Sequence, residues 1–138
     1  MLDTTPLGLL ARRRAAQVDL SRLANLLNDG ARVYLPEIAD YEVRRSFLLH
    51  DLHDSLRELD RLKRQLDYAP LTTVIMGRAA SFWAAARRRG TPTADRHALD
   101  GDVILASQAI EMGATVLTEN VRHFGQFVPT LRWQDVSA

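Results

Sequence analysis

The sequence predicts an α/β fold in which helices flank a central, mainly parallel sheet of about four to five short strands. Short apolar segments with high β-propensity, such as 33–35 and 114–118, alternate with longer segments that repeat apolar residues every three to four positions. A chain of 138 residues can bury one hydrophobic core, and it contains no internal repeat or long linker. We therefore expect a single domain over residues 1–138.

The first half of the chain is expected to begin with a short strand end at Met1–Thr4, stopped by the turn signal Thr5-Pro6. The elements predicted after it are a short helix over Leu7–Arg13, a helix over Asp19–Asn28 that ends at Gly30, a strand over Val33–Leu35, and helices over Pro36–His50 and Ser55–Asp67.

The second half continues the alternation of strands and helices. The predicted elements are an extended piece at Tyr68–Leu71, a helix capped by Thr72 or Thr73 that runs to Arg89, a loop over Thr91–Arg96, a helix over Asp100–Met112, a strand over Ala114–Thr118, a helical turn near Val121–Gln126, and an extended piece at Leu131–Trp133. Ligands of parallel sheets bind beyond the carboxyl ends of the strands, so we look for chemistry there.

Composition excludes several classes of protein. The absence of cysteine rules out disulfide scaffolds, thiol nucleophiles and thiolate metal sites, and it favours a reducing, cytoplasmic setting. No run of 18 apolar residues predicts a membrane span, and the N-terminal residues lack the basic start of a signal peptide. No P-loop, dinucleotide glycine fingerprint or zincin motif is present.

The net charge of +1 conceals an unusual set of charged residues. Lys63 is the only lysine among 18 positive residues, and Asp outnumbers Glu by 12 to 5. Arginine binds phosphate through a planar pair of donors, so its abundance suits a phosphate-containing partner. Biased codon usage explains the same count equally well.

Three acidic residues occupy the positions where such a sheet would present chemistry. Asp3 follows the first strand, Glu42 lies within or beside the apolar stripe of its helix, and Asp102 opens a helix above a buried face. Each has a structural explanation: a turn-forming aspartate, a salt bridge from Glu42 to Arg45 or Arg13, and a favourable charge at a helix N-terminus. The inward stripe that we predict for the helix of Glu42 consists of Ile38, Tyr41, Arg45, Leu48 and Leu49.

Taken together, the three acids can converge on one edge of the sheet. Converging carboxylates repel one another and lose hydration, and a hard divalent cation such as Mg²⁺ relieves both costs. A site of this kind on an arginine-rich surface suits metal-assisted hydrolysis of a phosphodiester.

The sequence resembles the PIN-domain nucleases, especially the VapC-like toxins of type II toxin–antitoxin pairs. The resemblance covers nearly the whole chain, and the ordered set of motifs is more specific than any one motif. The segments that carry it are Leu2–Thr5, Leu35–Arg45, Leu99–Ala109 and Ala114–Asn120 followed by Phe124.

The resemblance implies a three-layer αβα PIN-like fold and endoribonuclease activity that depends on Mg²⁺ or Mn²⁺. It places the three metal-binding and catalytic acids on Asp3, Glu42 and Asp102. The fourth, variable position falls on Asn120 instead of an aspartate, which weakens a second metal site. The resemblance also implies an RNA substrate, a cognate antitoxin and a homodimer.

Other residues are candidates for supporting roles. Thr4, Thr5 and Thr118 can orient Asp3 or bind metal waters, and Asp100 can cap its helix or add a ligand. The candidates for binding RNA are Arg12, Arg13, Arg14, Arg45, Arg87 and Arg88. The apolar positions that suit either core packing or a dimer or antitoxin surface are Phe82, Trp83, Ala86, Leu52, Leu56 and Leu59.

Two alternative functions remain open from sequence. A non-catalytic PIN-like module could bind RNA or protein, which Asn120 and the short first strand favour. A PIN nuclease with a housekeeping role in RNA processing would need no antitoxin.

Overall fold

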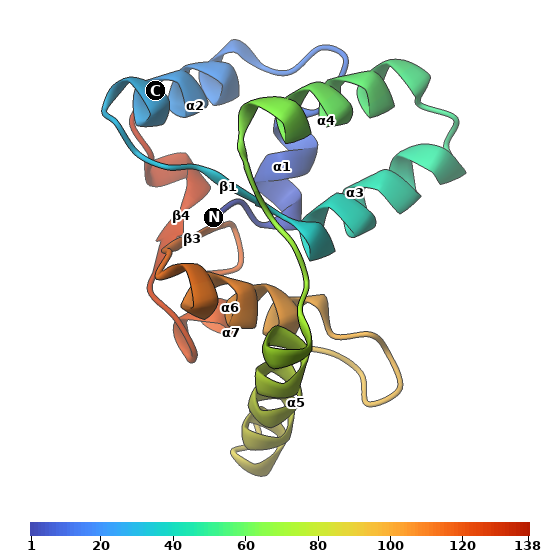
Figure 1. Cartoon of the computed structure of the whole chain (residues 1–138), viewed down its shortest axis with the longest axis vertical. Helices are drawn as coiled ribbons and strands as arrows, with labels where there is room; N and C mark the ends of the chain where they lie inside the picture. Colours follow the sequence, from blue (N-terminus) through green and yellow to red (C-terminus); the bar gives the residue numbers. More distant parts are fainter.

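Seven α-helices surround a small parallel sheet in the computed structural model, which describes residues 1–138 (Figure 1). The helices are α1 (Thr4–Leu10), α2 (Gln17–Asn28), α3 (Glu37–Leu49), α4 (His53–Gln65), α5 (Thr73–Arg88), α6 (Gly101–Met112) and α7 (Val121–Gly125). The strands are β1 (Tyr34–Pro36), β2 (Asp67–Ala69), β3 (Val116–Thr118) and β4 (Thr130–Arg132), and a short 3₁₀ helix covers Trp133–Asp135. None of the helices is both long and apolar enough to cross a bilayer.

The N-terminal residues join the strands into one sheet. β1 pairs in parallel with β2, and β3 pairs in parallel with β4. Between these pairs, Leu2 forms a parallel bridge with Leu117, and its N–H donates to the carbonyl of Tyr34 at 3.0 Å. The resulting order is β2, β1, the N-terminal segment, β3 and β4. The predicted mainly parallel sheet of four to five short strands is therefore confirmed.

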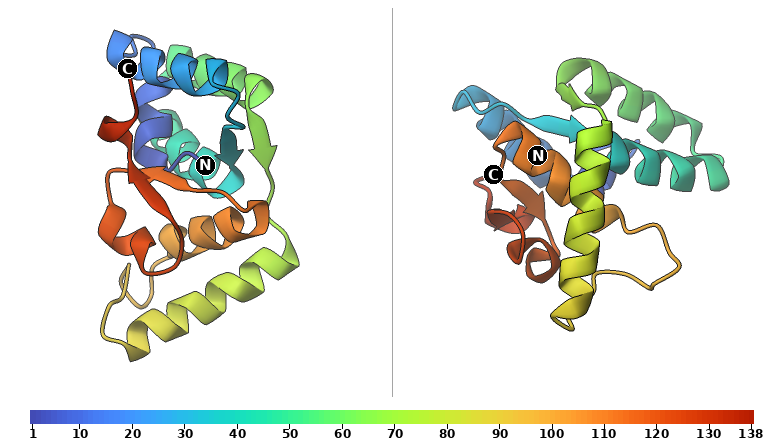
Figure 2. Two further views of the ribbon diagram at one scale, coloured as in Figure 1. Left: turned by 90° about the vertical axis from the view of Figure 1, so that its left-hand side faces the viewer. Right: turned by 60° about the horizontal axis from the view of Figure 1, so that its bottom comes forward.

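Helices cover both faces of this sheet. Figure 2 shows the strands at mid-height in its left view, with α1 to α4 on one side and α5 to α7 on the other. α5 packs along α6 (Figure 1), and its C-terminal half contacts the segment after α7, where Phe82 stacks on Phe127 and Arg89 donates to Gln126 at 2.9 Å. This arrangement is the predicted three-layer αβα architecture.

Helix α1 begins earlier than the sequence indicated. We predicted a helix over Leu7–Arg13 after a turn at Thr5-Pro6, but α1 starts at Thr4 with Asp3 as its N-cap. Proline is tolerated in the first turn of a helix because the N–H groups there have no partner within the helix. The early start brings Thr4 and Thr5 onto the first turn, directly beside Asp3.

The inward face of α3 also differs from the prediction. Tyr41, Leu48 and Leu49 are exposed, whereas the buried side chains of this helix are Ile38, Ala39, Asp40, Val43 and Phe47. Both stripes fit a helical repeat, so periodicity alone does not distinguish them. The buried stripe is the one that includes an acid, and that acid is fully paired: Asp40 contacts Arg44 at 2.8 Å and Lys63 at 3.3 Å.

Candidate active site

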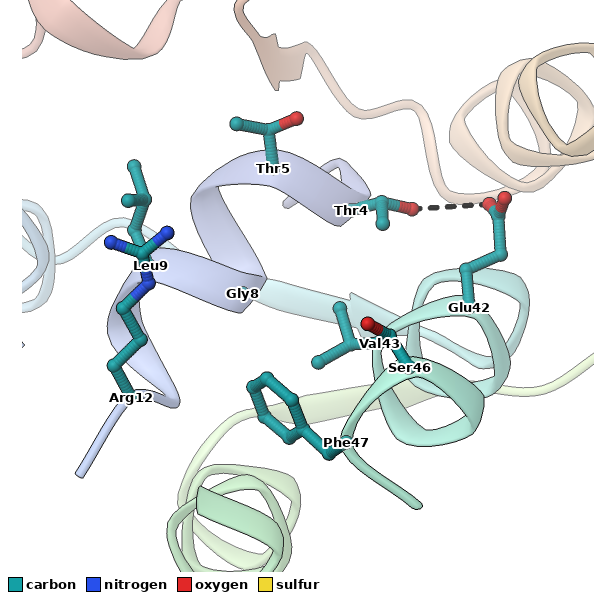
Figure 3. A pocket seen from close by; sticks show the side chains of 9 residues that line it. All are labelled: Thr4, Thr5, Gly8, Leu9, Arg12, Glu42, Val43, Ser46 and Phe47. Atoms are coloured by element: carbon teal, nitrogen blue, oxygen red, sulfur yellow. Dashed lines mark hydrogen bonds between the residues drawn. The ribbon is translucent and has the colours of Figure 1, made fainter. Parts of the chain in front are cut away.

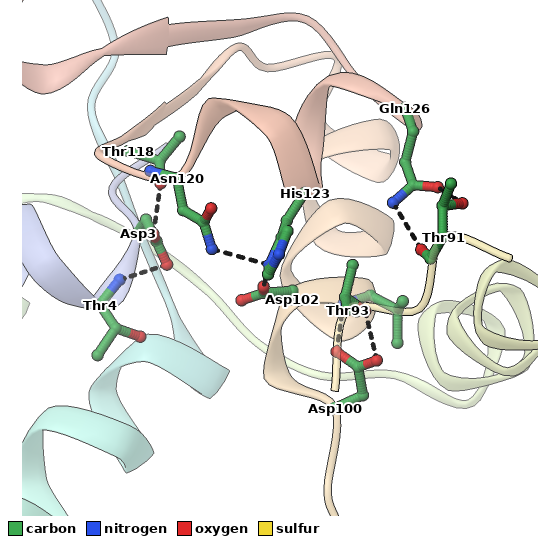
Figure 4. A network of polar contacts seen from close by, with 11 residues as sticks. Asp3, Thr4, Thr91, Thr93, Asp100, Asp102, Thr118, Asn120, His123 and Gln126 are labelled. Carbon is green, nitrogen blue, oxygen red and sulfur yellow. Dashed lines mark hydrogen bonds and ion pairs between the residues drawn. The ribbon is translucent and has the colours of Figure 1, made fainter. Parts of the chain in front are cut away.

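Acidic and hydroxyl side chains gather at the edge where the N-terminal segment and β3 end. Asp3 caps α1, Thr118 ends β3, and Asp102 lies in the first turn of α6 (Figure 4). Glu42 reaches the same edge from α3, where it meets Thr4 (Figure 3). The three acids predicted to converge are therefore brought to one edge of the sheet.

Asp3 is held by hydrogen bonds to both of its carboxylate oxygens. The backbone N–H of Thr4 donates to Oδ1 at 2.7 Å, and the hydroxyl of Thr118 donates to Oδ2 at 2.6 Å. Burial nevertheless raises the pKa of Asp3, because these two neutral donors replace only part of the lost hydration. The carboxylate is fixed in orientation and has no cation beside it.

Glu42 lies between a hydroxyl and an arginine. The hydroxyl of Thr4 donates to Oε1 at 3.1 Å, and Arg45 approaches Oε2 at 3.6 Å. Burial is the largest cause that raises the pKa of Glu42, and repulsion from Asp3 and Asp100 adds to it. The predicted salt bridge to Arg45 is thus present, but it does not offset the loss of hydration.

A glycine makes room for the Glu42 carboxylate. A Cβ atom added at Gly101, the first residue of α6, would lie 2.5 Å from Oε1 of Glu42. Real contacts of this kind are essentially never so short, so any other residue at this position would displace the carboxylate. Gly101 therefore allows α6 to approach Glu42 closely, and its role was missed from the sequence.

Asp102 has the most strongly perturbed pKa of the three acids. Burial raises the pKa of Asp102 to about 6, and repulsion from Asp3 and Asp100 contributes in the same direction. A contact of 2.9 Å between its Oδ2 and Nδ1 of His123 opposes this shift. Asp3 contributes repulsion that raises the pKa of both Glu42 and Asp102, so the three carboxylates lie within electrostatic range of one another.

Asp100 has a separate, structural role. Its Oδ1 accepts from the N–H of Val103 at 3.4 Å, which caps α6, and its Oδ2 accepts from the hydroxyl of Thr93 at 2.5 Å. Thr93 lies in the loop between α5 and α6, so Asp100 also ties this loop to the site (Figure 4).

His123 is a site residue that the sequence analysis did not identify. Its Nδ1 contacts both Oδ2 of Asp102 and, at 2.8 Å, Nδ2 of Asn120. Residues three apart share a face of a helical turn, so the spacing from Asn120 to His123 was an available signal. The amide of Asn120 therefore faces the site. Asn120 is the fourth, variable position of the PIN-like pattern, where this chain has asparagine instead of aspartate.

The predicted RNA-binding arginines lie in different surroundings. Arg45 lies next to Glu42 and stacks on Tyr41, and Arg12 lines a groove that also contains Glu42. Arg13 pairs with Asp54 at 3.1 Å, and Arg14 is exposed.

The arginines at the end of α5 are arranged differently. Arg87 stacks on Trp83 and donates to the carbonyl of Ala94 at 2.6 Å, while Arg88 is exposed beside it. These contacts give Arg87 a structural role in holding the loop after α5.

The donor set of this edge fits a hard divalent cation. It offers carboxylate, amide and hydroxyl oxygens, which are the ligands of Mg²⁺ and Mn²⁺. No three acidic or histidine side chains lie close enough together to form a complete metal cage. Mg²⁺ does not require such a cage, because it is typically bound through one or two carboxylates and keeps several waters.

Comparisons with known proteins agree with this architecture. The crystal structure of VapBC2 from Rickettsia felis bound to a DNA fragment from their promoter contains a chain that matches with a TM-score of 0.79 and 16% identity, over 96% of this chain and 97% of that one. Chains in FitAcB from Neisseria gonorrhoeae and in VapBC-1 from nontypeable Haemophilus influenzae match with TM-scores of 0.71 and 0.72, at 20% and 18% identity. The FitAcB match covers 97% of this chain and 97% of that chain, and the VapBC-1 match covers 98% of each.

These structural matches show a common fold at low sequence identity. No curated protein sequence matches the chain significantly. The sequence model of the PIN domain, however, matches residues 1–126, which include all three acids, Asn120 and His123. The chain belongs to the PIN domain family.

Proposed function

We propose that the protein is a metal-dependent endoribonuclease and the toxin of a type II toxin–antitoxin pair. Membership of the PIN domain family supports a hydrolase that acts on phosphodiester bonds. The observation that carries the proposal is the convergence of Asp3, Glu42 and Asp102, each with a raised pKa. A phosphate could approach these carboxylates only after a cation had neutralised them.

In this proposal Asp3, Glu42 and Asp102 hold Mg²⁺ or Mn²⁺, which when bound would supply Lewis-acid activation of water and phosphate. The surrounding groups of the chain keep the carboxylates in place. Thr118 and the N–H of Thr4 fix Asp3, and the hydroxyl of Thr4 holds Glu42. Since these donors are neutral, they orient the acids and leave their negative charge available to a cation.

The proposed reaction is hydrolysis of an RNA strand. A water oxygen forms a bond to phosphorus, the bond from phosphorus to the 3′ oxygen breaks, and that oxygen takes up a proton. The products carry a 5′-phosphate and a 3′-hydroxyl. Arg45, which lies beside Glu42, and Arg12, which lines the groove that begins at Glu42, are placed to neutralise phosphates of the bound strand.

An antitoxin and a second copy of the chain are the proposed protein partners. The matching structures from three bacteria carry the names VapBC2, FitAcB and VapBC-1, which supports a protein partner for this chain. The corner between α3 and α4 exposes the apolar side chains of Leu48, Leu49 and Leu52, with exposed fractions of 58%, 78% and 44%. Apolar side chains gathered in this way are typical of a protein interface.

A non-catalytic binding module is the second candidate function. The specific observation that favours it is Asn120, whose neutral amide stands where a fourth carboxylate would strengthen metal binding. A housekeeping nuclease for RNA processing would use the same site, and it differs from a toxin only in its partner.

Cleavage of labelled RNA tests the nuclease proposal. We expect cleavage with Mg²⁺, and loss of cleavage with EDTA or in the Asp102→Asn variant. Asp29→Asn is the matched control, because Asp29 is an exposed acid at the end of α2. Cleavage that persists in EDTA and in Asp102→Asn would refute metal-dependent hydrolysis. RNA binding without cleavage by the wild-type protein would support the binding module.

Expression in bacteria separates a toxin from a housekeeping enzyme. We expect growth to stop on expression, and to recover when a small protein encoded beside the gene is produced as well. The Asp102→Asn variant should have no effect on growth. Normal growth with active wild-type enzyme would favour the housekeeping role.

A further inference from the structure

A groove runs beside the carboxylate site, between α1 and α3. It has a volume of about 220 Å³ and begins at Thr4 and Glu42, which are joined by a hydrogen bond at one end (Figure 3). Because Glu42 belongs to both the groove and the carboxylate site, a molecule in this groove would adjoin the proposed point of cleavage.

The lining of the groove combines three kinds of chemistry. Leu9 supplies half-buried apolar surface, Val43 and Phe47 form a floor that is only 4% and 8% exposed, and Thr5 and Ser46 supply hydroxyl groups. Arg12 follows the end of α1 and lies away from the Thr4–Glu42 contact (Figure 3). Unlike Arg13, which is paired with Asp54, Arg12 is exposed and has no ion pair. Its guanidinium is therefore free to bind an anionic group.

A glycine keeps the groove open. Gly8 lies inside α1, where glycine is less favourable than alanine for helix formation. A Cβ added at this position would meet Val43 at 3.8 Å, an ordinary contact distance. Alanine would therefore fit without strain, so the fold does not require glycine here. What the missing side chain provides is space above Val43.

We propose that this groove binds the nucleoside adjacent to the scissile phosphate, with its base against Leu9 and the floor formed by Val43 and Phe47, and a flanking phosphate on Arg12. This inference rests on the proposed ribonuclease function and adds a subsite to it. Unpaired bases bind through apolar contact on their faces and hydrogen bonds at their edges, which the apolar and hydroxyl sides of the groove supply. Arginine is the residue best suited to a phosphate.

Binding of single nucleotides tests the subsite directly. The four ribonucleoside 5′-monophosphates are titrated with Mg²⁺ into ¹⁵N-labelled protein, with ribose 5-phosphate as the probe that lacks a base. We expect at least one nucleotide to shift the amide signals of Gly8, Val43 and Phe47, and to bind about tenfold more tightly than ribose 5-phosphate. Equal binding of ribose 5-phosphate, or no shift at these amides, would overturn the inference.

Substitutions in the groove provide a second test with matched controls. Gly8→Ala should raise KM for RNA about fivefold with little change in kcat, because it fills space used in binding. The control is Gly77→Ala, a helix-interior glycine of α5 with nothing within 4 Å of an added Cβ. Arg12→Gln should weaken nucleotide binding, unlike Arg64→Gln, which removes an exposed charge of α4.

The outcomes distinguish this inference from the proposed function. If the wild-type protein cleaves RNA but Gly8→Ala behaves like Gly77→Ala, the groove is not a subsite and the nuclease proposal stands. If the wild-type protein cleaves no RNA, the proposed function itself fails. Equal effects of Arg12→Gln and Arg64→Gln would show general electrostatic attraction and would also overturn the subsite.

Discussion

Two of the three acids of helix α3, Asp40 and Glu42, are in opposite electrostatic situations. Asp40 is 6% exposed, and it contacts both Arg44 and Lys63. Glu42 is less buried, yet its nearest cation is Arg45 at 3.6 Å, and it shares its surroundings with Asp3. Burial alone therefore does not identify a functional acid. The distinguishing feature of Glu42 is that its neighbours compensate its charge only in part, through the 3.6 Å contact with Arg45.

Replacing Glu42 should produce the largest effect on activity. We expect Glu42→Gln to lower kcat/KM for RNA by about a hundredfold to a thousandfold, because the amide no longer attracts a cation. The free energy of unfolding should stay the same or rise, since a poorly hydrated charge is removed. Cleavage assays and urea denaturation measure the two quantities. Normal cleavage by Glu42→Gln would remove this residue from the catalytic site.

Replacing Asp40 should lower stability and leave activity unchanged, which is the opposite of the effect expected for Glu42. Asp40→Asn leaves Arg44 and Lys63 without their shared carboxylate, and we expect it to lower the free energy of unfolding by about 2–3 kcal/mol. At temperatures where the variant is folded, kcat/KM should match that of the wild type. A stable but inactive Asp40→Asn protein would contradict the contrast between the two acids.

Gly101→Ala moves the Glu42 carboxylate without removing it. The added Cβ would overlap the end of a flexible side chain, so we expect the free energy of unfolding to change by less than about 1 kcal/mol. Cleavage should fall about thirtyfold because Glu42 is displaced. Gly77→Ala is the control for helix propensity, and it should retain full activity. Equal activity of the two variants would show that the position of Glu42 is unimportant.

The sequence predicted the alternation of elements and the meeting of the three acids, because both follow from periodicity and from the geometry of parallel sheets. It failed on the inward face of α3, where Tyr41 and Leu48 are exposed, because two apolar stripes fit the same repeat. The buried stripe includes an acid, Asp40. Its partner Arg44 lies four residues on in the same helix, whereas its pairing with Lys63 depends on the packing of α3 against α4.

Gly101 and His123 were missed from the sequence for a similar physical reason. The role of Gly101 depends on how closely α6 approaches α3, and that of His123 depends on α7 folding over Asp102. Distances between separate helices are set by the packing of many side chains, and no local motif encodes them. Sequence reasoning therefore predicted that the acids converge, but it did not predict the residues that position them.

His123 should have a smaller effect on metal binding than the acids have. His123→Ala removes a hydrogen-bond partner of Asp102, and we expect the affinity for Mn²⁺ to fall about tenfold. His123→Asn keeps a donor near the same place and should recover part of this loss. Isothermal titration calorimetry gives the affinities, with His97→Ala as the control at an exposed histidine. Unchanged affinity in His123→Ala would show that Asp102 needs no such partner.

The smallest effect concerns the pH dependence of stability in the absence of metal. Asp102 has a pKa of about 6 in the folded chain, above its ordinary value of 3.8. The folded state therefore holds this proton more tightly than the unfolded state does, and the contribution of Asp102 to stability falls as the pH rises from about 4 to 6. The asparagine of Asp102→Asn cannot ionise. The free energy of unfolding of this variant, relative to that of the wild type, should therefore increase by about 1 kcal/mol as the pH rises from 4 to 6.

Urea denaturation of both proteins in EDTA, at pH 4, 5, 6 and 7, measures this difference. Every other titrating group is common to the two proteins, including the buried N-terminal amine with its pKa of about 6. Added Mg²⁺ should stabilise the wild type more than Asp102→Asn, because a bound cation favours the ionised carboxylate. If the difference in stability were constant from pH 4 to 7, the charge of Asp102 would be compensated as fully as that of Asp40, and the electrostatic contrast between the two acids would be wrong.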